Sequence, residues 1–154
     1  MYSKEVMEHF MNPRNVGEIK DADAVGEAGN TRCGDLMWVY LKVGRGADGA
    51  ESIDDIKFKT LGCAAAIATS SKATELAKGK SLEGALAITN SDIAASLGGL
   101  PPVKMHCSVL AADAIKEAVY DYYRKHNKPV SEQLESDHKR ISADRTAAEE
   151  HCQV

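Results

Sequence analysis

The chain has few aromatic residues, no long apolar run and no excess of positive charge. Phe, Trp and Tyr make up 5% of the 154 residues, so a core must be built mainly from aliphatic and alanine side chains. No stretch approaches the roughly 18 apolar residues of a membrane span, and no apolar leader opens the chain. The net charge of −4 argues against nucleic-acid binding by neutralisation of phosphates. We therefore expect a small cytoplasmic protein that contacts neither membrane nor nucleic acid.

Cysteine occurs four times, but no two cysteines form a C-x-x-C pair. The thiols are spread along the chain and can meet only through the fold. In a reducing compartment, ligands or reactive groups are expected rather than disulfides. Cys152 lies in a polar segment, where an incidental free thiol is the simplest interpretation. The other three stand beside a glycine or a second potential ligand, in the contexts Cys33-Gly34-Asp35, Gly62-Cys63 and His106-Cys107.

Alternation of apolar and polar residues predicts two strands, over residues 36–43 and 56–60. The loop between them ends in Asp48-Gly49, which is typical of a hairpin, so the strands are expected to be antiparallel. A further short strand is expected near Val25. Because the strands come first and helices follow, the order predicts an α+β fold, with a small antiparallel sheet packed by helices on one face.

Helical periodicity and capping residues predict helices over residues 4–11, 64–78 and 108–126. Ser81 and Ser91 are each expected to cap a short helix, and Leu100–Lys104 is expected to be extended because of its two prolines. The domain is predicted to comprise residues 1–126, with the long helix at its C-terminal end. Residues 127–154 are highly charged and poor in large aliphatic residues, so they are predicted to form a peripheral helix or a partly disordered tail.

The three cysteines with notable neighbours fall at junctions between loops, strands and helices. Cys33 precedes a predicted strand, Cys63 lies between a strand and a helix, and Cys107 stands at the start of the long helix. A thiol at a helix N-terminus feels the positive end of the helix dipole, which favours the thiolate that binds metal. Asp35 leaves the same face of an extended segment as Cys33, and His106 adds an imidazole. Together these groups suit a soft metal, or an iron–sulfur cluster held by an incomplete set of thiolates.

Taken singly, these residues have plainer interpretations. A lone cysteine is more often a small buried apolar residue than a ligand, and Asp35 alone could serve a turn or a cap. Two other functions also stay open. One is a binding module stabilised by structural zinc. The other is a hydrolase or transferase that uses Cys107 as nucleophile, with His9 or His126 as the base.

Several ordered motifs resemble the U-type iron–sulfur cluster assembly scaffolds, the IscU/NifU N-terminal family. The resemblance covers about residues 2–126 and includes no zinc ribbon or second cysteine-rich module. The segments that carry it are His9-Phe10-Met11-Asn12-Pro13-Arg14-Asn15-Val16-Gly17, Cys33-Gly34-Asp35, Gly62-Cys63-Ala64-Ala65-Ala66-Ile67-Ala68, Leu100-Pro101-Pro102-Val103-Lys104 and His106-Cys107-Ser108.

The resemblance implies a scaffold that is not itself an enzyme. Cys33, Cys63 and Cys107 would ligate a nascent [2Fe–2S] cluster built from iron and sulfur. Asp35 would be a ligand during assembly and would keep the cluster labile, and His106 would be an alternative ligand. Zinc could occupy the same residues. A homo-oligomer that shares a cluster would be one way to fill the fourth ligand position.

The resemblance also implies partners. Cys107 would accept persulfide sulfur from a cysteine desulfurase, a ferredoxin would supply electrons, and a frataxin-like protein would modulate assembly. The finished cluster would pass to apo-proteins. An Hsp70-type chaperone with its co-chaperone would bind a segment made of Leu100, Pro101, Pro102, Val103 and Lys104.

Overall fold

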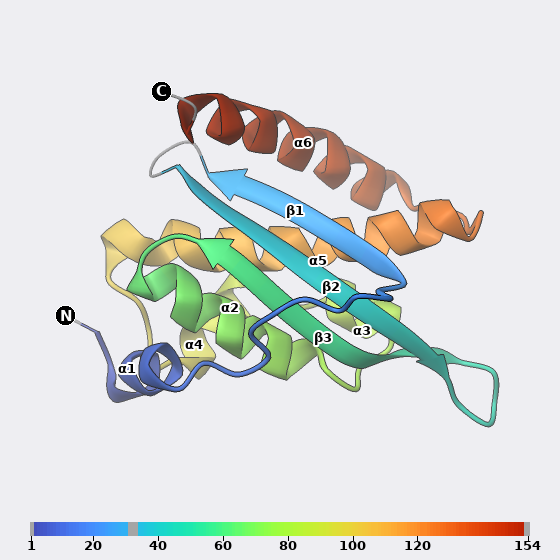
Figure 1. Cartoon of the computed structure of the whole chain (residues 1–154), viewed down its shortest axis with the longest axis horizontal. Coiled ribbons are helices and arrows are strands. Elements are labelled where there is room, and N and C mark those ends of the chain that lie inside the picture. Colours follow the sequence, from blue (N-terminus) through green and yellow to red (C-terminus); the bar gives the residue numbers. More distant parts are fainter. Residues whose placement is uncertain (1, 31–33, 153–154) are drawn as a thin grey trace.

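A three-stranded antiparallel sheet forms one layer of the protein, whose computed structural model describes residues 2–30 and 34–152 (Figure 1). The strands are β1 (Ala24–Asn30), β2 (Asp35–Arg45) and β3 (Glu51–Leu61), in the order β1-β2-β3. The predicted hairpin between β2 and β3 is confirmed. β1 pairs with β2 over its whole length, so it is longer than the short strand expected near Val25.

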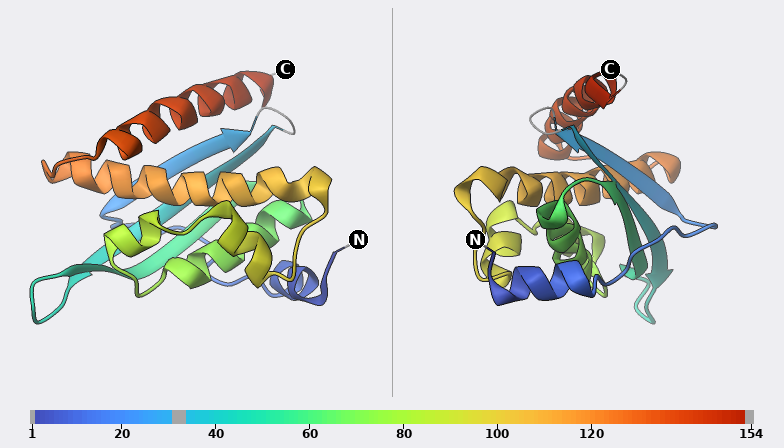
Figure 2. Two further views of the ribbon diagram at one scale, coloured as in Figure 1. Left: turned by 180° about the vertical axis from the view of Figure 1, so that it is seen from behind. Right: turned by 60° about the vertical axis from the view of Figure 1, so that its left-hand side comes forward.

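Helices cover one face of this sheet (Figure 2). The main ones are α2 (Ala64–Ala77) and the long helix α5 (Met105–Lys125), and both pack against the face on which Met37, Val39 and Leu41 are fully buried. Shorter helices, α3 (Leu82–Leu86) and α4 (Asn90–Ser96), lie against α5, and α1 (Lys4–Met11) lies against α2. The predicted α+β class and the helical layer on one face are therefore confirmed. No helix in the described ranges combines the length and the hydropathy of a membrane span.

Two local predictions were wrong by a few residues. α4 is capped by Thr89 rather than Ser91, because Thr89 and Asp92 form a capping box in which each side chain accepts from the other residue's backbone N–H at 3.0 Å. The segment predicted to be extended ends in a short 3-10 helix, η1 (Pro102–Lys104), and α5 follows it directly. A proline fits the first turn of a helix because its missing N–H would have no partner there. As a result α5 begins before Ser108, and His106 and Cys107 lie in its first turn.

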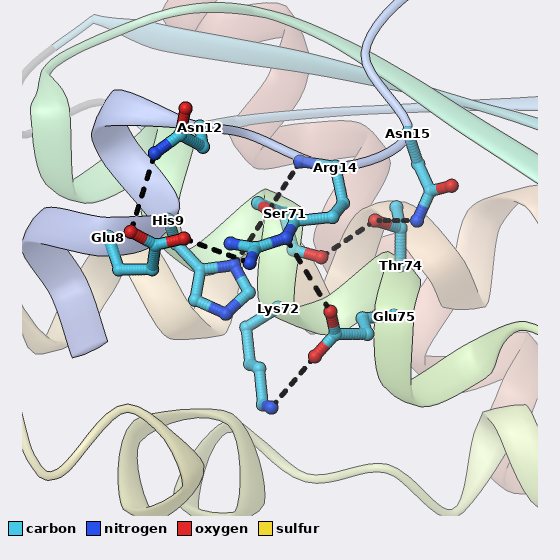
Figure 3. A network of polar contacts seen from close by, with 9 residues as sticks. All are labelled: Glu8, His9, Asn12, Arg14, Asn15, Ser71, Lys72, Thr74 and Glu75. Carbon is cyan, nitrogen blue, oxygen red and sulfur yellow. Dashed lines mark hydrogen bonds and ion pairs between the residues drawn. The ribbon is translucent and has the colours of Figure 1, made fainter.

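The motif His9–Gly17 ties α1 and the following segment to α2 (Figure 3). Ser71 on α2 contacts the buried ring of His9 at 2.8 Å and accepts from the backbone N–H of Arg14 at 2.9 Å. Burial, together with the charge of Arg14, lowers the pKa of His9 below its usual value, so the ring is neutral in this contact. Further on, the N–H of Gly17 donates to the carbonyl of Phe58 on β3, and the N–H of Phe58 donates to the carbonyl of Asn15, each at 2.8 Å. The segment therefore covers part of the free edge of β3.

The charged segment after residue 127 forms a sixth helix, α6 (Glu132–Cys152), along the other edge of the sheet. It packs against β1 and α5. Among its described side chains, the buried apolar ones are Leu134, Ile141 and Ala148, which recur at every seventh residue. Most of the helix surface is polar. Its few buried apolar side chains lie where it packs against α5 and β1.

Candidate metal and cluster site

Four of the five predicted ligands lie together at one end of the sheet. Asp35 is the first residue of β2, Cys63 is the N-cap of α2, and His106 and Cys107 belong to the first turn of α5. The site is therefore built where a strand starts and two helices start, as the sequence predicted for the junctions between loops and helices. The fifth predicted ligand, Cys33, lies outside the described residues.

The distances between these groups suit a shared metal. The ligand atoms of Asp35, His106 and Cys107 all lie within 4.8 Å of one another. Sγ of Cys63 is 3.9 Å from Sγ of Cys107, far longer than the roughly 2.05 Å of a disulfide. Two thiolates that bind one tetrahedral metal at about 2.3 Å stand about 3.8 Å apart. The pair is thus spaced like two ligands of one ion, and not like a bridge.

Asp35 has a buried side-chain oxygen that a bound cation would satisfy. The residue is 6% exposed, and its Oδ2 is buried with no hydrogen-bond partner among the described residues. A buried carboxylate oxygen without a partner is costly, and a bound cation would remove that cost. Gly62 makes the arrangement possible, because a Cβ there would lie 2.8 Å from Cβ of Ala66 and 3.1 Å from Cγ of Asp35.

Small residues let α2 approach the thiols closely. Ala65, Ala66 and Cys107 form a buried apolar cluster, with Cys63 packed against it. Thr69 on α2 donates to the backbone carbonyl of Cys107 at 3.2 Å, which fixes the start of α5 against α2. The thiol of Cys63 makes no capping hydrogen bond, although Cys63 is the N-cap of its helix. Both thiols lie at helix N-termini, where the dipole favours the thiolate.

Lys104, which was not among the predicted ligands, also reaches the site. Nζ of Lys104, at the end of η1, lies 3.8 Å from Sγ of Cys63. A cation beside a thiol stabilises the thiolate and offsets the negative charge of a site rich in thiolates. In the same segment Val103 is 76% exposed. The only sequence signal for the role of Lys104 is its closeness to His106, which gives no direction for its side chain.

The geometry disfavours a Cys–His nucleophile with a distant base. His9 contacts Ser71, and His126 is the C-cap of α5, at the opposite end of the 21-residue helix from Cys107. His126 is therefore not placed to take a proton from Cys107, and His9 is engaged with Ser71. The neighbours of Cys107 are a carboxylate, a second thiol and an adjacent imidazole, which together are a set of metal ligands.

Comparison with known proteins shows the family of the chain. The family described as the NifU-like N terminal domain matches residues 1–129. The chain belongs to this family. A NifU-like relative from Archaeoglobus fulgidus, iron-sulfur cluster assembly scaffold protein IscU 1, is 61% identical over 128 residues, which is 83% of this chain and 80% of the relative.

Two further comparisons concern a shorter relative and the fold. The IscU scaffold protein of Haemophilus influenzae is 53% identical over 127 residues, which is 80% of this chain and 97% of that protein. The crystal structure of the N-terminal part of a NifU-like protein from Brucella abortus has a TM-score of 0.59 and 22% identity, and covers 80% of this chain and 94% of that one. The latter likeness shows the NifU-like fold alone.

Proposed function

We propose that this NifU-like domain is a scaffold on which a labile [2Fe–2S] cluster is assembled and from which it is transferred to apo-proteins. One observation carries the proposal: a buried carboxylate oxygen, which has no hydrogen-bond partner among the residues that the structure describes, stands among thiols and an imidazole. A resident redox cluster is usually held by four thiolates. A set that includes an oxygen ligand binds iron less strongly and exchanges more easily, as a carrier requires. The names of the relatives support the same function.

The residues of the site would have different roles in cluster assembly. Two irons bridged by two sulfides need four protein ligands, and we assign three of them to Cys33, Cys63 and Cys107. Asp35 would be the fourth ligand during assembly, with His106 as the alternative. Zinc could bind the same groups, because their spacing also suits a single tetrahedral ion.

Cys107 is our candidate for the persulfide acceptor. Its thiolate would attack the outer sulfur of a persulfide on a cysteine desulfurase, forming a new S–S bond while the desulfurase cysteine leaves as a thiolate. This step involves no net change of oxidation state. Two electrons per sulfur, supplied by a ferredoxin, would then cleave the persulfide on Cys107 to a thiolate and a sulfide. The helix N-terminus supports the required thiolate.

The remaining partners follow from the same proposal. Leu100–Lys104 would be the segment bound by an Hsp70-type chaperone and its co-chaperone, and its exposed Val103 suits such binding. A frataxin-like protein would modulate assembly, and a homo-oligomer could share a cluster. Residues 1–126 would form the scaffold unit and 127–154 an addition to it. We expect the protein to act in a reducing compartment such as the cytoplasm, where thiols stay free.

The function is tested by anaerobic reconstitution. The reduced protein receives ferrous iron, cysteine, a cysteine desulfurase and reduced ferredoxin, and the visible absorption is followed while an apo-ferredoxin is offered. We expect a cluster to form and then to appear on the acceptor. A cluster that never leaves would instead indicate a resident redox site. Zinc held tightly, with no cluster and with unfolding upon chelation, would favour the structural-zinc alternative.

Asp35→Ala should slow cluster transfer to the apo-ferredoxin about tenfold, the usual scale for a change close to a metal. The carboxylate is the weakest of the proposed ligands, so its loss leaves a site that is filled by thiolates or imidazole and opens less easily. Asp48→Ala, in the exposed hairpin loop, is the control and should transfer at the wild-type rate. Equal or faster transfer by Asp35→Ala would mean that Asp35 does not keep the cluster labile.

A further inference from the structure

Helix α6 is an addition to the part of the chain that its relatives share. The NifU-like family matches residues 1–129, and α6 begins at Glu132. The Haemophilus influenzae relative is covered almost completely by an alignment of 127 residues, so it has little chain left for such a helix. The family match to residues 1–129 therefore leaves the role of α6 without an account.

Polar contacts hold the first two-thirds of α6 on α5. Arg140 donates two parallel hydrogen bonds of 3.0 Å to the carboxylate of Asp113, which is 7% exposed. Two residues earlier on α6, His138 lies 2.9 Å from the buried carboxylate of Glu117 and stacks on the ring of Tyr120 with 3.8 Å between centroids. Paired, directional contacts of this kind give α6 one defined position on α5.

Helix α6 buries few apolar side chains in this interface. Leu134, Ile141 and Ala148 are the buried apolar side chains among the described residues of α6. A 21-residue helix with so little apolar burial is marginal by itself and depends on docking. Elements with few buried apolar contacts open at a lower free energy than the core does. Opening of α6 is therefore expected to require less free energy than unfolding of the domain core.

The last turns of α6 contact the strand that leads to the ligands. A Cβ placed on Gly29 would lie 2.7 Å from Cβ of Ala148 and 3.1 Å from Cα of Arg145, so the helix touches β1 directly. Gly29 pairs with Leu36 on β2, and the next pair along the ladder includes Asp35. In Figure 1 the last turns of α6 lie beside the end of β1.

At this end of α6, two acidic side chains also lie close together. Glu27 on β1 is hydrogen-bonded to Glu149 of α6, and burial, that hydrogen bond and the repulsion between the two carboxylates raise the pKa of Glu27 to about 7. Arg145 of α6 and Trp38 of β2 act in the opposite direction. A contact between two carboxyl groups is weaker than an ion pair between opposite charges. The end of α6 near the site is thus held less firmly than its middle.

We propose that α6 is a clamp on the β1–β2 hairpin, and that its docking sets how tightly the site holds metal. The inference rests on the proposed function, because it takes the bound group to be a metal or cluster. Docked, α6 fixes Gly29 and Leu36, and through them the backbone of Asp35. Released, it lets this end of the hairpin move, and the carboxylate no longer stays beside the thiols. Groups that orient a ligand commonly change metal affinity by tenfold or more.

Two substitutions release the clamp at different points. Ala148→Glu forces a long charged side chain into the contact with Gly29, and Arg140→Glu replaces the bidentate pair with repulsion from Asp113. Ala143→Glu makes the same change as Ala148→Glu at an exposed position of α6 and is the matched control. Hydrogen exchange of the α6 amides shows whether each variant releases the helix.

Cobalt(II) is the probe, because its charge-transfer absorption reports thiolate ligands directly. We expect wild type and Ala143→Glu to bind cobalt alike, and both release variants to lose it to a chelator about tenfold faster. Unchanged loss of cobalt from a variant whose α6 amides exchange freely would overturn the clamp alone. So would wild-type protection of α6 in both variants, since the helix would then be part of the core. If wild-type protein shows no thiolate–cobalt band, the proposed function itself fails.

Discussion

Replacing Cys107 with serine should abolish persulfide labelling by a cysteine desulfurase and reduce cluster assembly to background. The side chain is 1% exposed and lies within 4.8 Å of the ligand atoms of Asp35 and His106. Serine is nearly the same size, so the fold should persist. Its hydroxyl does not ionise near neutral pH, however, so it is neither a good ligand for iron nor a nucleophile toward sulfur. The two remaining thiolates leave a weaker set of ligands for two irons.

Mass spectrometry after incubation with the desulfurase and cysteine measures the labelling, and the visible spectrum measures assembly. Cys152→Ser is the matched control, because the sequence assigns no role to that thiol. It should be labelled and loaded like wild type. A Cys107→Ser protein that still carries one added sulfur per chain would move the acceptor role to Cys63 or Cys33. Full assembly on Cys107→Ser would contradict the ligand set as a whole.

The strand β2 and the hairpin between β2 and β3 could be predicted because each has a local signal. Residues 36–43 alternate apolar and polar side chains, and the structure buries Met37, Val39 and Leu41 on the helical side. The hairpin loop is marked by Asp48-Gly49, and Gly79 after α2 adopts the positive φ that favours glycine. Each of these signals depends on a few neighbouring residues. The tertiary packing of the fold agrees with the local structure that they predict.

The site was predicted in its residue types but not in its geometry. The contact between Cys63 and Cys107 joins positions 44 residues apart, and no local pattern reports such a distance. The chemistry of thiols at helix starts indicated a metal, and the family resemblance named the set. That Oδ2 of Asp35 has no hydrogen-bond partner in the described part of the chain, and that Lys104 approaches Cys63, could be learned only from the assembled fold.

The docking of α6 on α5 and β1 could not be predicted from the sequence, for a different reason. Its buried apolar residues recur at every seventh position, too sparsely to make an amphipathic stripe, so composition alone pointed to a peripheral or partly disordered segment. Its partners are charged groups on α5, such as Asp113 and Glu117. In the sequence those residues look like an ordinary solvated helix face. Ion pairs between distant elements leave no periodic signal in either partner.

Close packing between β1 and α5 is the contact on which the relative position of the ligands depends most. Asp35 begins the strand paired with β1, and Cys107 lies at the start of α5. Where the two elements meet, Gly26 of β1 lies against the backbone of α5. A Cβ there would be 2.2 Å from the backbone nitrogen of Ala118 and 2.5 Å from the carbonyl oxygen of Ala114. Backbone atoms of a helix cannot rotate away as a flexible side chain can, so one methyl group must push the two elements apart.

Gly26→Ala is therefore expected to lower the free energy of unfolding by about 3 kcal/mol, the upper end for overpacking. For a chain of this size the melting temperature should fall by about 10 °C. Gly46→Ala is the control, because it lies in the exposed hairpin loop and its nearest neighbour is an oxygen of the Asp48 side chain at 3.0 Å. Thermal and urea unfolding of the metal-free proteins measure both variants. If Gly26→Ala melts like Gly46→Ala, β1 can move away from α5 at little cost, and the position of Asp35 relative to Cys107 must be fixed by other contacts.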